Sequence, residues 1–354
     1  MNDTFQKIFL MIFITFMFVA CIIPFIKRIA IKVNAIDVPR GRHKHKKITP
    51  KFGGIAVFLG FLLGYMIFGT PSSIMNAILI GSFIIILTGA LDDVMELGAL
   101  SKLIGQIAAA SVIVFYGKIL MQDISAFGIY LDFGILAYPI TLIFIVACIN
   151  CINLIDGLDG LSGGISAIYF LTIGIIATLQ GKFGLDFVIA FIMFGSILGF
   201  LVHNFSPATI FAGDSGAMFF GFIISVVALL GFKNVTLTSL IIPLLVLAIP
   251  ILDTLFAIIR RSIKGEKIMV GDRYHIHHQF LNRNLSEKTT VLIIYIIDLL
   301  FAFASIVYVL KDEVLSYFIY GILLVIVFAF VLKTNVIADK ETLKSKIAKK
   351  LRRK

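Results

Sequence analysis

Two adjacent aspartates, Asp92 and Asp93, close a long apolar segment that begins near residue 74. Neighbouring carboxylates repel each other unless a cation or a proton lies between them. An ionised aspartate inside a membrane helix costs roughly 2.5–3.5 kcal/mol on insertion scales, and a helix C-terminus disfavours negative charge. A solvated helix end is the plain alternative, but a pair at this position predicts a cationic partner and a chemical role.

The most specific pattern is the run from Asn150 to Gly164, in which polar residues recur at every third position. This spacing places their side chains along one side of a helix. Glycine follows each aspartate of the run and allows a ligand to approach the backbone closely. Carboxylate and amide oxygens suit Mg²⁺ or Mn²⁺, particularly where a phosphate supplies the remaining ligands. The four polar residues are Asn150, Asn153, Asp156 and Asp159.

A further acid, Asp214, lies in a Gly-Asp-Ser-Gly run at 213–216, where another apolar segment begins. Aspartate is a common N-cap, so a structural role at the start of a helix is the plain alternative. A helix N-terminus lined by glycine and serine also attracts phosphate. The spacing does not separate these two roles, and one residue could serve both.

Three histidines, His275, His277 and His278, follow Asp272 and Arg273 in the longest charged loop. A zinc site is the competing interpretation, but none of the three cysteines falls in a loop predicted on the same side of the membrane. Histidine also serves phosphates as a hydrogen-bond donor and a proton carrier. We favour phosphate binding for this cluster.

The basic loop at residues 39–54 contains Lys51 and ends in a pair of glycines. Membrane anchoring explains most of its positive charge. Its proline and glycine boundaries indicate an ordered loop near the acids, where lysine and arginine neutralise phosphates. Lys51 is therefore among the predicted substrate contacts.

Long apolar segments must position all of these residues. Hydrophobic residues make up 60% of the 354-residue chain and charged residues 14%, whereas soluble domains are about half apolar and a quarter charged. A helix needs about 20 apolar residues to cross a hydrocarbon core of roughly 30 Å. We predict an all-α, polytopic transmembrane helical bundle with about eleven spans; ten stay compatible, because several segments are short or polar at one end. The predicted spans are 5–26, 52–69, 74–91, 102–120, 136–153, 160–179, 185–202, 215–232, 237–259, 290–310 and 314–332.

Lysine and arginine in short loops favour the cytoplasmic side of a membrane. Four segments, 27–51, 92–102, 260–288 and the chain after 332, hold 26 of the 31 basic residues. With eleven spans these segments share one side, so that the N-terminus is outside and the C-terminus is cytoplasmic. The acids described above and all six histidines then share the cytoplasmic face of a multi-pass protein of the inner cell membrane.

We predict one transmembrane catalytic domain at residues 1–332 and a basic cytoplasmic tail at 333–354. The charge of the tail suits anionic lipid headgroups, at about 1 kcal/mol for each basic residue near the surface. No recognised nucleic-acid-binding fold accompanies it, so membrane lipids and not nucleic acids are its expected partners. The predicted cytoplasmic loops are 27–51, 92–102, 153–160, 203–214 and 260–289.

Acids that hold a divalent metal, together with basic and histidine donors, are typical of phosphoryl transfer. At a membrane boundary they imply one substrate from water and one from lipid. The paired aspartates, the run 153–160, the run 213–216 and the run 275–278 occur in this order in the polyprenyl-phosphate N-acetylhexosamine-1-phosphate transferase superfamily, glycosyltransferase family 4. The chain resembles this family over roughly residues 37–285.

The resemblance implies transfer of a sugar-1-phosphate from a UDP-N-acetylhexosamine to undecaprenyl phosphate, with Mg²⁺ as cofactor and UMP as product. It implies that Asp92 and Asp93 orient or deprotonate the lipid phosphate and that the histidines bind diphosphate. The implied metal ligands are Asp214, Asp93 and Asn153. The predicted catalytic residues are Asp92, Asp93, Asp156, Asp159, His277 and His278. The predicted substrate contacts are Lys51, Asn150, Asn153, Asp156, Asp159, Arg273, His275, His277 and His278. Dimerisation is implied by the resemblance alone.

Two features indicate the branch of the family. Ile276 interrupts the histidines, and Lys51 lies in an Ile-Thr-Pro-Lys-Phe-Gly-Gly run, whereas the peptidoglycan branch, phospho-N-acetylmuramoyl-pentapeptide transferase, carries three consecutive histidines and Gly-Thr-Pro-Thr-Met-Gly-Gly. The chain is more similar to the undecaprenyl-phosphate N-acetylglucosamine-1-phosphate transferases that begin cell-surface polysaccharide or teichoic acid synthesis. The peptidoglycan branch is the alternative within the family, and no single residue identifies the sugar.

A cation-coupled transporter is the alternative from another class, because Asp253 and Asp298 lie inside predicted spans. A transporter places its acids near the middle of the membrane, whereas these motifs gather at one boundary. Asp253 also lies near enough to the cytoplasmic end of its span to support the site instead.

Overall fold

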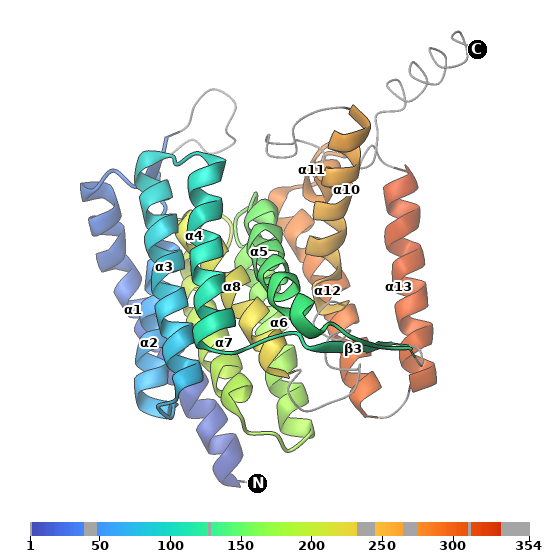
Figure 1. The fold of residues 1–354 in the computed structure, drawn as a ribbon. Helices are drawn as coiled ribbons and strands as arrows, with labels where there is room; N and C mark the ends of the chain where they lie inside the picture. The colour runs from blue at the N-terminus through green and yellow to red at the C-terminus, as the bar shows by residue number, and fades with distance from the viewer. Residues whose placement is uncertain are drawn as a thin grey trace.

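The computed structural model describes residues 2–38, 48–126, 129–231, 245–264, 275–310 and 313–333. These ranges form a helical bundle with two short antiparallel hairpins, β1–β2 (Ile36–Asp37 and Thr49–Pro50) and β3–β4 (Asp123–Ala126 and Ile129–Asp132) (Figure 1). The helices are α1 (Asn2–Lys32), α2 (Gly53–Phe68), α3 (Ser73–Met95), α4 (Ala99–Ser111) with the π-helical η1 (Val112–Tyr116), the 3₁₀ turn η2 (Gly134–Leu136) with α5 (Ala137–Ile155), α6 (Leu161–Leu179), α7 (Leu185–Asn204), α8 (Gly213–Gly231), α10 (Ala248–Lys264), α11 (Ile276–Leu281), α12 (Glu287–Val309) and α13 (Glu313–Lys333).

The helical class predicted from the apolar segments is confirmed. A helix overlaps each predicted span, and within the described ranges eight helices are long and apolar enough to cross a membrane. Two shorter apolar helices, Gly53–Phe68 and Val314–Ala329, accompany them. Part of the predicted span 237–259 lies outside the described residues. Its described helix, α10, ends later than the predicted span, because it continues through Arg260 and Arg261 to Lys264. The total of eleven spans and their orientation stay predictions.

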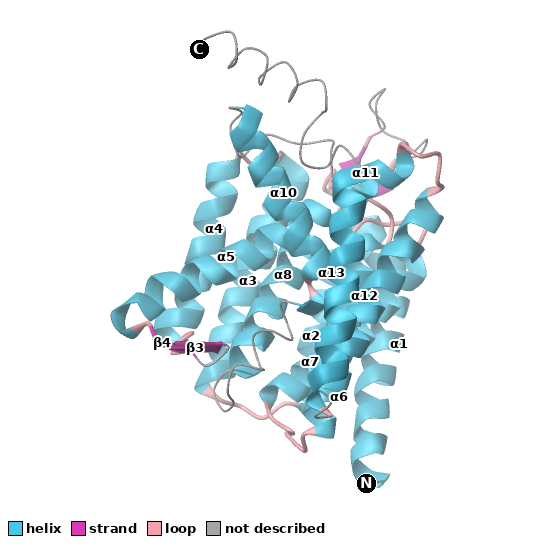
Figure 2. Ribbon diagram, turned by 90° about the vertical axis from the view of Figure 1, so that its right-hand side faces the viewer, coloured by secondary structure: helices cyan, strands magenta, loops and turns pink. Residues whose placement is uncertain are grey.

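Successive long helices run in alternating directions, so that their ends gather at two opposite levels (Figures 1 and 2). The N-terminus of α1 lies at one level, and α11 lies at the other. The level of α11, called the α11 end below, also holds the C-terminal ends of α3, α5 and α7 and the N-terminal ends of α4, α6 and α8. The predicted acidic motifs therefore meet at one end of the bundle.

Helix α8 lies at the centre of the bundle. It contacts α2, α3, α5, α6 and α7, and its side chains from Ser215 to Leu229 are buried. Glycines allow two neighbouring helices to approach its first turn very closely. A Cβ atom on Gly89 of α3 would lie 2.3 Å from the Ser215 Cα, and one on Gly54 of α2 would lie 2.1 Å from the Gly216 Cα. These contacts fix the start of α8, and with it Asp214, against α3.

Candidate active site

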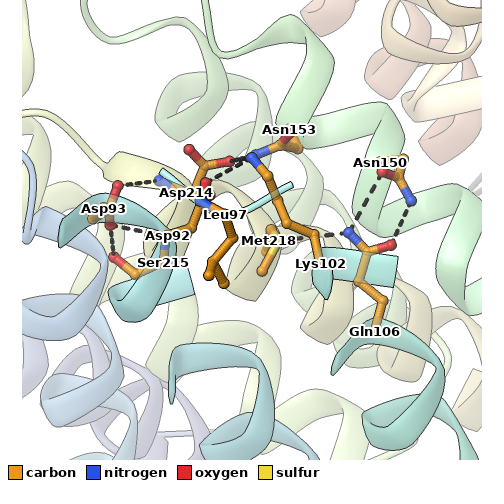
Figure 3. Close-up of polar contacts among 10 residues, drawn as sticks. All are labelled: Asp92, Asp93, Leu97, Lys102, Gln106, Asn150, Asn153, Asp214, Ser215 and Met218. Atoms are coloured by element: carbon orange, nitrogen blue, oxygen red, sulfur yellow. Dashed lines mark hydrogen bonds and ion pairs between the residues drawn. The ribbon is translucent and has the colours of Figure 1, made fainter. Parts of the chain in front are cut away.

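Asp93 of α3 caps the first turn of α8 (Figure 3). Its Oδ1 accepts a hydrogen bond from the Asp214 N–H at 2.8 Å. Its Oδ2 accepts from the Ser215 N–H at 3.1 Å and from the Ser215 Oγ at 2.8 Å. The first N–H groups of a helix lack partners within the helix, and negative charge is favourable there. The cap of α8 is thus a carboxylate from another helix, while the Asp214 side chain makes different contacts.

Lys102 bridges the two other carboxylates of this cluster. Its Nζ lies 2.6 Å from Asp92 Oδ2 and 3.0 Å from Asp214 Oδ1. Asn153 donates from Nδ2 to the same Asp214 Oδ1 at 2.8 Å. Asp92 Oδ1 accepts the Leu97 N–H at 2.7 Å. Lys102 is the cationic partner predicted for the paired aspartates. The sequence predicted that such a partner exists but did not identify it as Lys102.

A short turn explains why Lys102 reaches Asp92. Helix α3 ends at Met95, and Glu96 then adopts the left-handed conformation with φ 51°. Gly98 precedes α4 in an extended conformation. The two helices are therefore antiparallel neighbours, which brings the first turn of α4 beside the last turn of α3. Lys102 is the one basic residue of the segment 92–102, and this is the sequence signal that singles it out.

The loop between α5 and α6 holds Asp156 and Asp159. Asp159 Oδ2 accepts the Ala208 N–H at 2.8 Å, and Asn204 Oδ1 accepts the Gly160 N–H at 3.0 Å. These bonds join this loop to the segment before α8. The half-buried Asp156 accepts from Ser162 Oγ at 2.5 Å. Desolvation raises the pKa of the Asp156 carboxyl to about 7; Asp214 and Asp159 add to this, whereas the Ser162 hydroxyl opposes it.

Two polar cavities meet at the cluster. The first, of about 440 Å³, is lined by Asn153, Asp156 and Asp159 among others. The second, of about 540 Å³, is lined by Asp92, Glu96 and Lys102 among others. Residues common to both linings are Asp37, Lys51, Asp93 and Asp214. The hairpin β1–β2 thus brings the predicted Lys51 to the acids, together with Asp37, which the sequence did not predict as a site residue.

Asn150 lines a third cavity, of about 580 Å³, whose walls are mostly apolar. This cavity lies between α4, α5 and α10, and Lys102, Asn153 and Arg261 also line it. Asn150 donates from Nδ2 to Gln106 Oε1 at 2.7 Å. The structure therefore separates Asn150 from Asp156 and Asp159, which line the first polar cavity. Lys102 and Asn153 lie where polar and apolar cavities meet.

The histidines are attached to α10 and to the loop that holds Asp156. Asp253 of α10 contacts His275 Nδ1 through Oδ2 at 2.8 Å and accepts the Ile276 N–H through Oδ1 at 2.7 Å. The buried His277 packs against Gly157, where an added Cβ would lie 2.7 Å from the histidine Nε2. The ring of His278 lies 4.3 Å from that of His277. Among the described residues, no histidine lines either polar cavity, and the predicted contact Arg273 lies outside the described residues.

The donor set of the cluster fits Mg²⁺. The carboxylates of Asp92, Asp93 and Asp214 and the amide oxygen of Asn153 are hard ligands. The ammonium of Lys102 contacts two of these carboxylates, Asp92 and Asp214, which leaves one formal negative charge in excess. Within the described ranges, no three His, Cys, Asp or Glu side chains are arranged as a group that could hold a metal as they stand. The residues are suitable, but Lys102 lies among them.

Fold and site together define a multi-pass membrane protein with an acid- and lysine-lined site at one end of its bundle. A model of glycosyl transferase family 4 matches residues 75–232. The chain is 39% identical to the probable undecaprenyl-phosphate N-acetylglucosaminyl 1-phosphate transferase of Bacillus subtilis, over 96% of each chain. It is 30% identical to the decaprenyl-phosphate N-acetylglucosaminephosphotransferase of Mycolicibacterium smegmatis, over 85% of this chain and 82% of the relative. It is 28% identical to the undecaprenyl-phosphate alpha-N-acetylglucosaminyl 1-phosphate transferase of Escherichia coli, over 79% and 78%. The chain belongs to glycosyl transferase family 4, which confirms the resemblance drawn from its motifs.

Proposed function

We propose that this protein transfers N-acetylglucosamine-1-phosphate, or a closely related N-acetylhexosamine-1-phosphate, from a UDP-sugar to undecaprenyl phosphate. The products are a polyprenyl-diphosphate-sugar and UMP. Family membership and the names of the three relatives support this proposal. The observation that carries it is the position of Lys102 and Asn153, which line both a polar and an apolar cavity.

The apolar cavity suits the lipid acceptor. Its lining consists mainly of aliphatic and aromatic side chains from α4, α5 and α10, and Lys102 and Arg261 are basic residues in the same lining. An isoprenoid chain buries apolar surface in such a cavity, while a lysine or arginine binds a phosphate headgroup. The acceptor phosphate would then lie beside the acid cluster.

The polar cavities suit the nucleotide donor. Lys51 lines both of them and supplies positive charge opposite the acids. Asp156, Asp159 and Asn153 offer acceptors and an amide to a base, a ribose or a sugar hydroxyl. Support for the predicted histidine contacts is indirect, because His277 packs on the Asp156 loop and does not line the cavity itself.

In the transfer, an oxygen of the acceptor phosphate forms a bond to the sugar-bearing phosphorus of the donor. The bond from that phosphorus to the bridging oxygen breaks, and UMP leaves with the bridging oxygen. We favour this direct attack because the lipid phosphate is already an oxyanion and needs positioning more than activation. A covalent aspartyl intermediate is the alternative. Trapping phosphorylated enzyme from UDP-sugar in the absence of acceptor would establish that alternative.

Mg²⁺ is the proposed cofactor, with Mn²⁺ as a substitute. Asp214, Asn153 and Asp93 would hold it, and Asp92 lies close enough to the same cluster to join them. When bound, such an ion neutralises charge on the diphosphate of the donor. The contacts of Asp93 with α8 give it a second, architectural task that the sequence did not predict.

The site is proposed to face the cytoplasm at the inner cell membrane. The α11 end that carries it also carries the ends of the predicted basic loops, including Lys27, Lys32 and Lys51. Positive charge in short loops favours the cytoplasmic side. The transporter alternative is weakened, because Asp253 contacts His275 and the Ile276 N–H instead of standing alone in the membrane.

The proposal is tested by assaying the purified protein for UMP release in the presence of Mg²⁺, undecaprenyl phosphate and UDP-N-acetylglucosamine. UMP should appear only when donor and acceptor are both present. Substitution of other UDP-N-acetylhexosamines then identifies the sugar. Absence of UMP with every UDP-sugar, from protein that is folded, would refute the proposed activity.

A further inference from the structure

The ammonium of Lys102 lies between the carboxylates of Asp92 and Asp214 (Figure 3). It contacts one oxygen of Asp92 and one of Asp214 at ion-pair distances of 2.6 and 3.0 Å. The Asp92 side chain is 5% exposed, whereas the side chains of Lys102 and Asp214 are 26% and 29% exposed. The bridge is therefore buried at Asp92 and accessible to solutes at Lys102 and Asp214.

The oxygens that hold the ammonium are those that a divalent ion would need. Asp214 Oδ1 already accepts from both Lys102 and Asn153. Oxygen ligands of Mg²⁺ lie about 2.0–2.1 Å from the ion, so an ion that bridged Asp92 Oδ2 and Asp214 Oδ1 would occupy the space that the ammonium fills between them. The bridged arrangement matches the absence, among the described residues, of a group ready to hold a metal.

Charge balance favours exchange of the ammonium for a divalent ion. Two carboxylates, those of Asp92 and Asp214, contact one ammonium directly, and buried charges are costly unless they are paired. A single positive charge leaves the cluster under-neutralised, and a doubly charged ion would neutralise it more fully. The ammonium can keep the acids together, but it is a weaker counter-ion than Mg²⁺ or Mn²⁺.

The structure also offers the displaced side chain a place to go. Lys102 lines the apolar cavity between α4, α5 and α10 as well as the second polar cavity. Rotation about its flexible stem would carry the ammonium from the acids into the polar mouth of that cavity. In the proposed enzyme this is the position of the acceptor phosphate.

We propose that Lys102 is an exchangeable counter-ion, which bridges Asp92 and Asp214 until a divalent cation displaces its ammonium toward the apolar cavity. Metal binding and the Lys102 bridge are thus mutually exclusive. The inference rests on the proposed function only for the use of the freed ammonium, because the exchange itself needs no substrate. It makes Lys102 a positioning residue for the acids and a competitor of the metal.

Binding of Mn²⁺ to the purified full-length protein, without substrates, tests the exchange. The free ion is followed by its electron paramagnetic resonance signal as protein is added. Lys102→Met removes the ammonium at similar length and should tighten Mn²⁺ binding by about tenfold. Lys51→Met is the matched control, since Lys51 lines the same polar cavities but makes no ion pair with these acids among the contacts of the described residues. It should change the affinity by less than about threefold.

A second variant protects the test against loss of folding. Lys102→Arg keeps the positive charge and adds donors that suit carboxylates, so it should weaken Mn²⁺ binding relative to the natural protein. The thermal midpoint of Lys102→Met should fall without metal and recover with Mn²⁺. Equal affinities in Lys102→Met and Lys51→Met, or tighter binding in Lys102→Arg, would overturn the exchange.

The exchange and the proposed activity fail in different ways. UMP release by the natural protein, together with unchanged Mn²⁺ affinity in Lys102→Met, contradicts the exchange and leaves the activity intact. Tighter Mn²⁺ binding in Lys102→Met without UMP release from any UDP-sugar supports the exchange and contradicts the activity. No Mn²⁺ binding to any variant while UMP is released overturns the exchange.

Discussion

Adjacent residues of a helix point about 100° apart, and this separates the tasks of the paired aspartates. Asp93 faces α8 and accepts three hydrogen bonds from its first turn. Asp92 faces α4 and contacts Lys102. Asp93 thus caps α8 and Asp92 forms the ion pair with Lys102, although the sequence suggests two equivalent acids.

This division predicts different consequences for two matched substitutions. Asp93→Asn places an amide against N–H donors that need an acceptor, so it should lower the free energy of unfolding by about 1–3 kcal/mol. Asp92→Asn loses one ion-pair partner but keeps an oxygen for the Leu97 N–H, so it should lower the thermal midpoint less than Asp93→Asn does while reducing turnover by at least about a hundredfold. Thermal melting and UMP release measure the two effects. Equal destabilisation by both variants would contradict the assignment.

Asp214 lines both polar cavities and contacts Lys102 and Asn153, which also line the apolar cavity. Asp214→Asn keeps the shape of the side chain and removes its charge. We expect at least about a hundredfold loss of turnover with folded protein retained. A fully active Asp214→Asn variant would refute the proposed metal role.

At the scale of elements, the first turn of α8 depends on glycines of α2 and α3. Gly89→Ala would place a methyl group 2.3 Å from the Ser215 Cα, a backbone atom that cannot rotate away. Overpacking of this kind typically costs 1–3 kcal/mol, and we expect a correspondingly lower free energy of unfolding together with lost activity. Gly321→Ala in α13 is the control, because nothing lies within 4 Å of its added Cβ. Both variants are compared by thermal melting; a benign Gly89→Ala would contradict the close approach.

Helix α10 is the element that holds the histidine run. Asp253→Asn removes the carboxylate that contacts His275 Nδ1, so we expect a reduced kcat/KM for the UDP-sugar in steady-state assays. The matched control is Asp298→Asn, which changes another buried aspartate, in α12. That variant should retain turnover under the proposed function. An equal loss of turnover in Asp298→Asn would contradict a specific role for the contact between Asp253 and His275.

The sequence predicted the helices well, but it did not predict which side chains contact each other. Apolar segments near 20 residues long predicted the helices, since span length is set by the membrane. Motifs next to these segments identified Asp92, Asp156 and Asp214, and the structure brings these motifs to one end. How the helices pack decides the partner of each polar side chain: Lys102 for Asp92, Gln106 for Asn150 and Asp253 for His275. No local pattern encodes such packing, and the same limit applies to Asn150, which lines another cavity than Asp156 and Asp159.

At the scale of the whole molecule, the site is built from helices that are far apart in the chain. Asp92, Lys102, Asn153 and Asp214 come from α3, α4, α5 and α8. These residues belong to the last turns of α3 and α5 and the first turns of α4 and α8, and those helix ends gather at the α11 end of the bundle (Figure 1). One end of the bundle therefore brings polar cavities next to an apolar cavity, as the proposed use of one soluble and one lipid substrate requires.

The proposed orientation predicts which end is accessible from outside the cell. Glu96 is exposed at the α11 end, and Gln180 is exposed after α6 at the opposite end. In a chain whose three natural cysteines are replaced, Gln180→Cys should react in intact cells with a thiol reagent that does not cross membranes. Glu96→Cys should react only after the membrane is opened. The reverse pattern would place the site outside.

The fate of the phosphate nearest the sugar tests the central claim most directly. Purified protein is incubated with undecaprenyl phosphate, Mg²⁺ and UDP-N-acetylglucosamine that carries a radioactive label in that phosphate. Sugar-1-phosphate transfer predicts that the label moves to the lipid fraction and that unlabelled UMP is released in equal amount. Label that stays in a soluble UDP product would contradict the proposed reaction.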